Sequence, residues 1–383
     1  MQDIITTSNS GLSRQALKHQ ADRQKIVRLF HGVYIDAEKY AALDVAGKYR
    51  ARANAFLATH PRLKPWGITA AALEGAPVLL GAPLHFSGTR NYTRSRQEGC
   101  LFHEALPPVP KVNNAIAQTL FECAISSPLA DALLAGNHLL QSLTSNTAGE
   151  LQAHRTIDEK TSEALIWSPL DSKSARVKAY CTFDAAALDT SKPGFLNTYL
   201  TARNIEFTSP EAELAWLGFA QLCVAFGTKR AIRKALNTGA YFTDQAESPA
   251  ESLLIARCVE LGFSIPRTQV NIINPASGKH MGRVDGLWPS NAVLKGLYQS
   301  DSKYGRQLYC NQYGDNDSVI IEFDGRQKYQ QDYFDALDKE RTRQNAISNL
   351  GFRFIRIDWD DLMQPEQLRS ILKAVKVPRL RQG

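Results

Sequence analysis

The sequence predicts a multi-domain α/β protein, of mixed α+β organisation, and three observations support this. Its 383 residues are enough for two or three hydrophobic cores. The first sixty residues have the pattern of a turn, a polar helix and a hairpin, and from residue 248 helical and strand patterns alternate. The expected divisions are 1–60, a mixed middle region at 61–247, a helix-flanked mixed sheet at 248–376 and a basic tail at 377–383.

Composition and charge narrow the function classes. The formal net charge of +7 favours a polyanionic partner. No apolar run is long enough for a membrane span, and the polar first ten residues have no signal-peptide pattern, so we expect no membrane contact and a cytoplasmic location. The six cysteines are scattered without metal-ligand spacing, which indicates small buried residues in a reducing compartment.

The N-terminal segment has the order expected of a winged helix-turn-helix. Ser13 can cap a helix that starts at Arg14, and Gly11 suits the preceding turn. Two β-rich runs, 26–29 and 33–35, follow with Gly32 in the bend, as in a short hairpin. In this class of domain the helix enters a DNA major groove and the hairpin lies over the flanking backbone.

Polar residues on this helix and hairpin are the candidate DNA contacts, because basic side chains on phosphates supply most non-specific affinity. They are Ser13, Arg14, Gln15, Lys18, Arg28 and His31. The alternative is that the helix presents only a solvated basic face on a small accessory domain.

The middle region is mixed, with turn-rich stretches, apolar runs and helical patterns in alternation. Helical patterns cover 44–60, 114–143 and 211–238, whereas 150–210 is broken by turn-rich stretches and is interpreted as a linker, an insertion or an extra subdomain.

The C-terminal region begins with a strong helix, for which Ser248 is the N-cap, Pro249 the first residue and Gly262 the end. The expected order is helix, three strands, helix, strand, helix. The strand patterns are RTQVNIIN, GRVDGLWP, SVIIEFDG and FRFIRIDW, and a polar connection separates the second from the third.

One acid lies on the first helix and one on each of two central strands. Glu251, Asp285 and Glu322 can therefore converge at one sheet edge, where carboxylate oxygens would hold Mg²⁺ or Mn²⁺. Such a metal activates water and offsets charge on a phosphate. Lys328 is the nearby cation that could orient the water or neutralise the phosphate.

These residues carry a family resemblance. The segments SPAES, GRVDGLWP, IIEFDGRQKY and ERTRQNAISNLGFRFIRIDW resemble the PD-(D/E)XK nuclease superfamily, in particular its very-short-patch-repair-like endonuclease domains. With the N-terminal GLSRQALK and VRLFHGVYID, the chain also resembles bacterial AbiEi-like antitoxins and transcriptional regulators. The resemblance covers roughly residues 5–40 and 248–362.

The resemblance implies roles for particular residues. Asp285 and Glu322 match the metal-binding acids, and Glu251 matches the helix-borne acid. Asp324 belongs to the same motif as Glu322 and is itself expected to be catalytic, as a ligand or as an orienting group. Arg343 and Gly351 match the helix and turn that follow the motif. The chain departs from the pattern because Asp324 occupies the position of the usual lysine, which leaves Lys328 as the candidate for a displaced catalytic lysine.

Three functions remain open at this point. The first is a DNA-binding protein that hydrolyses DNA phosphodiesters with Mg²⁺, as an endodeoxyribonuclease. The second is a non-catalytic repressor or antitoxin, whose C-terminal domain serves for homodimer formation or for control of a cognate toxin. The third is a nuclease directed at RNA.

Overall fold

A computed structural model describes residues 4–88, 99–105, 115–143, 207–226, 229–302, 305–315, 317–323 and 333–380. The protein is a mixed α/β chain, as the sequence predicts, with three separate sheets. It forms two compact units, which divide within the middle region: the described residues up to 139 and those of 215–240 belong to the first unit, and those from 241 to the second, together with 140–143 and 207–214. No helix in these ranges is long and apolar enough to cross a membrane.

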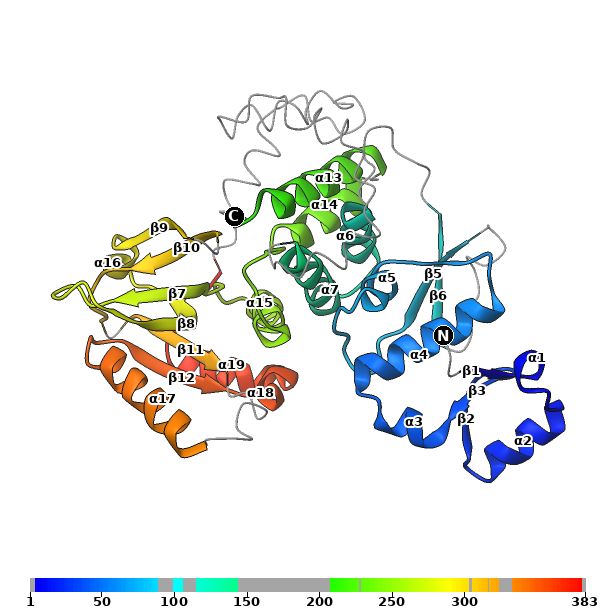
Figure 1. Ribbon diagram of the computed structural model, residues 1–383. Helices are drawn as coiled ribbons and strands as arrows, with labels where there is room; N and C mark the ends of the chain where they lie inside the picture. Colours follow the sequence, from blue (N-terminus) through cyan, green and yellow to red (C-terminus); the bar gives the residue numbers. More distant parts are fainter. Residues whose placement is uncertain are drawn as a thin grey trace. The chain divides into compact units, whose positions relative to one another are not determined.

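The first unit begins with a three-stranded antiparallel sheet in the order β1-β3-β2 (Figure 1). Its elements are β1 (Ile4–Thr6), α1 (Thr7–Ser10), α2 (Arg14–Asp22), β2 (Ile26–Phe30), β3 (Val33–Asp36), α3 (Ala37–Ala42) and α4 (Val45–Thr59). The expected helix, hairpin and following helix are confirmed. Before α2, the first described residues form a strand, β1, and one helical turn, α1.

Local chemistry explains these elements. The Ser13 hydroxyl accepts a hydrogen bond from the Ala16 amide at 3.2 Å, and so satisfies a donor that the first turn of α2 leaves without a helical partner. Gly32 adopts φ 74° in the hairpin bend, a conformation that glycine reaches without strain. Leu17 of α2 then packs against Ile26 and Tyr34 of the hairpin, which holds the helix on the sheet.

A second three-stranded sheet and a set of helices complete the first unit. The sheet order is β4-β5-β6. The elements are β4 (Lys64–Pro65), α5 (Ile68–Leu73), β5 (Leu84–Gly88), β6 (Cys100–Glu104), α6 (Ala115–Ser126), α7 (Leu129–Ser142), α13 (Pro210–Phe226) and α14 (Lys229–Gly239), of which α7 and α13 cross the division between the units. The helical pattern over 114–143 becomes two helices because Pro128 cannot continue the first one.

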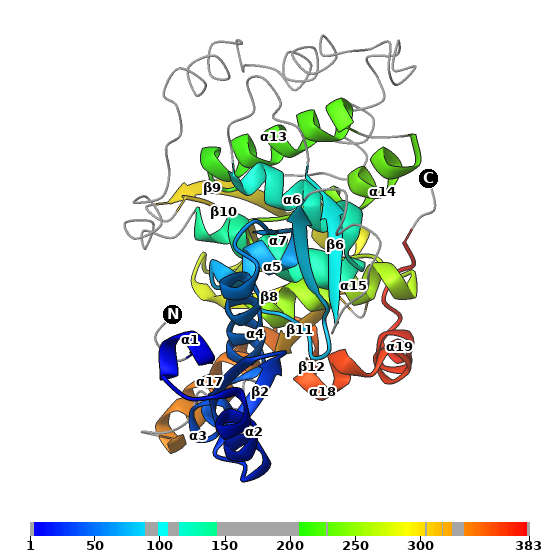
Figure 2. The same ribbon diagram turned by 90° about the vertical axis from the view of Figure 1, so that its right-hand side faces the viewer.

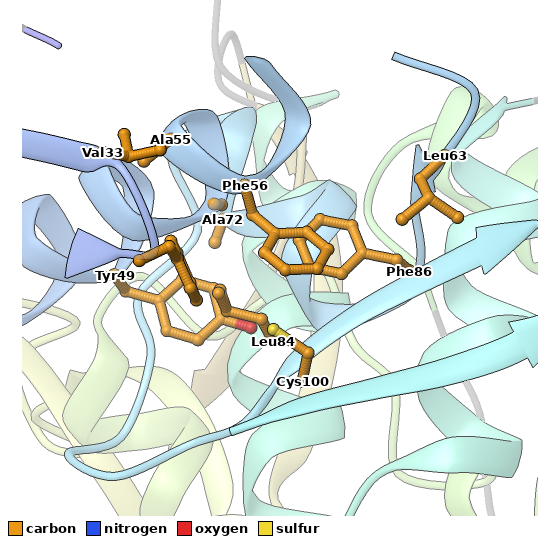
Figure 3. Close-up of a cluster of buried hydrophobic side chains, with 11 residues drawn as sticks. Val33, Tyr49, Ala55, Phe56, Leu63, Ala72, Leu84, Phe86 and Cys100 are labelled. Carbon is orange, nitrogen blue, oxygen red and sulfur yellow. The ribbon is translucent and has the colours of Figure 1, made fainter. Parts of the chain in front are cut away.

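One apolar cluster connects the N-terminal sheet with the second sheet of the same unit (Figure 3). It contains Phe30 and Val33 of the hairpin, Phe56 of α4, and Phe86 of β5. The rings of Phe56 and Phe86 stack with centroids 4.8 Å apart, while Phe30 meets Phe56 edge-on at 5.0 Å. Shared aromatic burial therefore ties the hairpin to residues on both sides of position 60.

The second unit is built on a six-stranded mixed sheet with the order β12-β11-β8-β7-β10-β9. Figures 1 and 2 show α17 on one side of this sheet and α15, α18 and α19 on the other. The elements are α15 (Pro249–Leu261), β7 (Arg267–Ile273), β8 (His280–Trp288), α16 (Asn291–Leu294), β9 (Leu297–Ser302), β10 (Gly305–Cys310), β11 (Val319–Phe323), α17 (Tyr333–Ser348), β12 (Arg353–Ile357), α18 (Trp359–Met363) and α19 (Pro365–Ala374).

Two parts of this unit differ from the sequence-based expectation. The connection between the second and third expected strands contributes a helical turn and the β9–β10 hairpin, whose β10 pairs in parallel with β7. The apolar signal of the hairpin is sparse, because among its described residues it contributes Leu297, Leu308 and Cys310 to the core. The expected final helix is divided into α18 and α19, with Pro365 starting the second helix.

The basic tail is anchored as far as it is described. The Arg379 guanidinium lies 4.2 Å from the centroid of the Phe263 ring and donates to the Leu261 carbonyl at 3.2 Å. The Leu380 amide also donates to the Gly262 carbonyl. These contacts hold the tail against the C-terminal end of α15.

The first unit buries an ionisable residue, Glu122 of α6, which is 3% exposed. Its carboxylate accepts hydrogen bonds from the Gly67 amide at 2.9 Å and from the Gln118 side chain at 2.8 Å. Burial raises the pKa of Glu122 to about 7, although both hydrogen bonds oppose the shift.

This shift gives a testable pH dependence. Between pH 4.5 and 7 the folded chain keeps a proton on Glu122 that the unfolded chain has lost, so this group makes the free energy of unfolding fall as pH rises. In Glu122→Gln this contribution disappears, and the unfolding free energy measured in urea should fall less steeply with pH. The exposed Glu74→Gln variant should keep the wild-type slope. Equal slopes in wild type and Glu122→Gln would contradict the assignment.

Candidate functional site

Helix α2 and the β2–β3 turn enclose a hollow of about 770 Å³. Arg14 and Lys18 of α2 line one side, and Arg28 and His31 of the hairpin line another. All four side chains are exposed, while Leu17, Ile26 and Tyr34 give the hollow a buried apolar base. The hollow is therefore a basic surface built on a packed support.

Hydrogen bonds fix the hairpin side of this hollow. Arg28 donates through Nε to the Phe30 carbonyl at 3.3 Å, and its Nη2 lies 3.2 Å from His31 Nδ1. These contacts hold the guanidinium against the turn, which reduces the side-chain entropy that a bound ligand would have to remove.

Four of the six expected DNA-contact residues meet at this hollow. Ser13 and Gln15 are exposed at the start of α2 but do not line it, and Ser13 acts as the helix cap. Sequence reasoning did not single out Thr7, Asp22 or Gln24, which also line the hollow. The sequence could have indicated them only by their positions, before the start of α2 for Thr7 and at or just after its end for Asp22 and Gln24.

The second candidate site lies in the second unit, around the acids expected to bind metal. Glu251 belongs to the first turn of α15 and is 4% exposed. Its Oε1 accepts from the Ser248 hydroxyl at 2.8 Å, and its Oε2 accepts from the Glu247 amide at 3.1 Å and from Gln269 Nε2 at 2.9 Å. Both carboxylate oxygens of Glu251 are thus occupied by protein donors.

Asp285 and Glu322 stand opposite each other on neighbouring strands. The antiparallel pairing of β11 with β8 runs through Ile321 and Gly286, and one step further in the same register brings Glu322 opposite Asp285. There Asp285 Oδ2 accepts a hydrogen bond from the Phe323 amide at 3.0 Å. Beyond the last paired residues, the Asp285 side chain thus replaces the β8 backbone as the hydrogen-bond acceptor for β11.

Gln269, whose backbone is strained, is the neighbour of Asp285 on the other adjacent strand, β7. Gln269 of β7 lies between the pairs Thr268–Gly286 and Val270–Val284, and so stands opposite Asp285. Its φ of 55° falls in the left-handed region, which is unfavourable for a residue with a Cβ. Strain of this kind persists where the surroundings enforce it and is frequent at functional sites. The Gln269 amide uses this conformation to reach Glu251.

Arg343 of α17 holds Glu322. Its Nη2 donates to Glu322 Oε1 at 3.1 Å and to Glu340 Oε1 at 2.7 Å, and its Nε donates to Glu340 Oε2 at 2.9 Å. The resemblance had marked Arg343, whereas Glu340 and Gln269 were missed because their roles depend on contacts between distant segments.

The acids influence each other electrically. The pKa of Glu251 and that of Glu322 are each raised to about 7, mainly by burial and in smaller part by the charge of Asp285. Arg343 opposes the shift at Glu322. Because Asp285 acts on both glutamates, the three acids form one electrostatic group.

The oxygen atoms show which of these acids suit a metal. In the part of the chain that the structure describes, Asp285 Oδ1 and Glu322 Oε2 have no hydrogen-bond partner, while the second oxygen of each is held by Phe323 or Arg343. Mg²⁺ commonly binds through one or two carboxylates together with waters and substrate phosphates. Asp285 and Glu322 fit this pattern.

A metal site of three protein ligands is not formed within the described ranges, where no group of three or more His, Cys, Asp or Glu side chains could hold an ion. Of the expected metal set, Glu251 lies close enough to influence Asp285 but is engaged by donors. Asp324 and Lys328, expected as catalytic residues, lie outside the described residues.

Comparisons with protein-family models, with curated proteins and with solved structures found no match to this chain. The site geometry therefore carries the functional argument.

The strain at Gln269 can be tested by a pair of substitutions. Gln269→Ala and Gln269→Gly both remove the amide that donates to Glu251, but only glycine relieves the positive φ. We expect Gln269→Gly to be more stable than Gln269→Ala by about 1 kcal/mol in urea unfolding.

Gln307 provides the matched control, since it stands beside Gln269 on β10 and has no positive φ. There the order should reverse, with Ala more stable than Gly by about 0.5–1 kcal/mol. The same order at both positions would argue against strain at Gln269.

Proposed function

We propose that the protein binds DNA through the basic hollow of α2 and the β2–β3 hairpin. The observation that carries this proposal is the convergence of Arg14, Lys18 and Arg28 around one exposed hollow. A helix followed by a basic hairpin agrees with the winged helix-turn-helix arrangement, in which phosphate contacts fix the position of the domain on the duplex. The net charge of +7 favours the same kind of partner.

We further propose that the second unit is a PD-(D/E)XK-like nuclease domain acting on DNA phosphodiesters. Asp285 and Glu322 would hold Mg²⁺ or Mn²⁺ through the oxygens that have no partner among the described residues. The metal supplies Lewis-acid stabilisation of the charge that develops on the phosphate. Glu251 and Gln269 support the site by fixing the segment opposite Asp285, and Lys328 is the candidate to orient water or neutralise phosphate.

A non-catalytic role is the second candidate, and two observations favour it. Glu322 is already paired with Arg343, and Glu251 is satisfied by protein donors, so the acids are partly balanced without a metal. In addition, Asp324 stands where the nuclease pattern has a lysine. A repressor or an AbiEi-like antitoxin would need only the basic hollow to bind DNA. Its second unit would then serve to form a homodimer or to bind a cognate toxin.

The DNA proposal predicts a change in salt dependence. Each lost phosphate contact lowers the slope of log K against log salt by about 1, so Arg14→Ala with Lys18→Ala should lower it by about 2. Fluorescence anisotropy on one fixed duplex over a salt series measures this slope. Lys64→Ala removes an exposed lysine of β4 that does not line the hollow and should leave the slope unchanged. An unaltered slope in the double variant would place DNA elsewhere.

The nuclease proposal predicts metal-dependent nicking. Asp285→Asn and Glu322→Gln should each lower the rate with Mg²⁺ or Mn²⁺ by roughly a hundredfold or more, because the metal supplies several kcal/mol and each 1.36 kcal/mol is a factor of ten. DNA affinity should be retained in both variants. Glu366→Gln, in a side chain that is 83% exposed, is the control. Wild-type protein that nicks neither DNA nor RNA with either metal would leave the non-catalytic candidate.

A further inference from the structure

The guanidinium of Arg343 is bonded from three directions. Besides its bonds to Glu322 and Glu340, it donates through Nη1 to the Arg283 carbonyl at 2.9 Å. Its side chain is 22% exposed, and that of Glu322 is 12% exposed. The contact between them is therefore largely shielded from solvent, where a hydrogen-bonded ion pair is stronger than at the surface.

The position of Arg343 does not depend on Glu322. Three of its four hydrogen bonds go to Glu340 and to the β8 backbone. Gly282 opens the space that the side chain occupies, since a Cβ at that position would lie 2.9 Å from Arg343 Cδ. The contacts with Glu340 and the Arg283 carbonyl would thus hold the guanidinium in place without Glu322, which accepts a hydrogen bond from this fixed donor.

We propose that Arg343 is a positioning residue that fixes Glu322 for cation binding and thereby sets the metal affinity of the Asp285–Glu322 pair. This inference rests on the proposed metal site. By holding Oε1 of Glu322, Arg343 leaves Oε2 as the metal-binding oxygen and removes rotamer freedom that metal binding would otherwise have to restrict.

The positive charge of Arg343 has an opposite effect, because it repels an incoming cation. Glu340 offsets this repulsion: it receives two hydrogen bonds from Arg343 in a bidentate pair, at 2.7 and 2.9 Å. Because Glu340 pairs with both Arg343 and Arg356, it offsets part of the positive charge, and we expect the effect of orientation to exceed the remaining repulsion. The contrary reading, in which Arg343 is a built-in competitor that blocks the metal, predicts effects of opposite sign.

Manganese binding separates these readings. Mn²⁺ affinity is measured by titration calorimetry on the full-length protein without DNA. Arg343→Gln and Arg343→Lys should each weaken binding by roughly 10–100-fold, the range for residues that orient metal ligands. Lysine keeps the charge but cannot reproduce the planar fork that spans Glu340, Glu322 and the Arg283 carbonyl. If Arg343 instead competes with the metal, Arg343→Gln should bind Mn²⁺ more tightly than wild type, and Arg343→Lys should bind it about equally.

Arg257→Gln is the matched control. Arg257 of α15 likewise pairs with a glutamate, Glu260, at 2.6 Å and donates to a backbone carbonyl, that of Leu362, at 3.0 Å. Its variant should bind Mn²⁺ within about twofold of wild type, below the range for ligand-orienting residues. Circular dichroism melting shows whether each variant is folded. If both Arg343 variants unfold, Glu340→Gln keeps Arg343 and Glu322 but weakens the bidentate anchor, and it should lower Mn²⁺ affinity in the same direction.

The outcomes distinguish this inference from the proposal on which it rests. Wild type that binds Mn²⁺, with Arg343 variants that bind as tightly or more tightly, overturns the role of Arg343 alone. Wild type that binds no Mn²⁺ overturns the metal site and this inference together. Loss of binding in Arg257→Gln equal to that in Arg343→Gln would assign the effect to a general loss of arginine–glutamate pairing in the second unit and contradict direct positioning of Glu322.

Discussion

The negative charge of Asp285 is the constraint around which the second unit's candidate site is built. It lies between two glutamates and raises the pKa of each. A carboxylate among like charges and strand backbones is costly unless donors or cations compensate it. The fold provides compensation on every side: the Phe323 amide for Asp285, Arg343 for Glu322, and Ser248 with Gln269 for Glu251. Burial without such partners would favour apolar residues at these positions.

The three acids differ in how many of their carboxylate oxygens accept hydrogen bonds, and this difference indicates different roles. Glu251 is 4% exposed and has donors on both oxygens, so it resembles a structural brace between α15 and β7. Asp285 and Glu322 each have one oxygen held and one without a partner among the described residues. An ion that enters this pair would replace repulsion between two carboxylates with attraction, which is the largest favourable change available to the group.

Local signals in the sequence were sufficient for much of the fold. Ser13 and Ser248 begin helices and Gly262 ends one through contacts within a few residues, and the sequence predicted the start of α2 and both ends of α15 correctly. The hairpin β9–β10 was missed because its strands bury few apolar residues and depend on β7 for pairing. The acids of the site were identified by residue type and spacing. Gln269 was not, because its role depends on a hydrogen bond to Glu251 on another element, which no short segment encodes.

The two candidate surfaces have opposite charge requirements, and this links their functions. The basic hollow attracts phosphates directly, whereas Asp285 and Glu322 repel them until a cation is bound. At the second site, therefore, metal and phosphate should bind with positive coupling, each raising the affinity for the other by the same factor. The first site needs no such coupling. Under the proposed function, DNA affinity would persist without metal whereas hydrolysis would require it. Metal binding by the oxygens of Glu322 and Asp285 would then distinguish a nuclease from a simple DNA-binding protein.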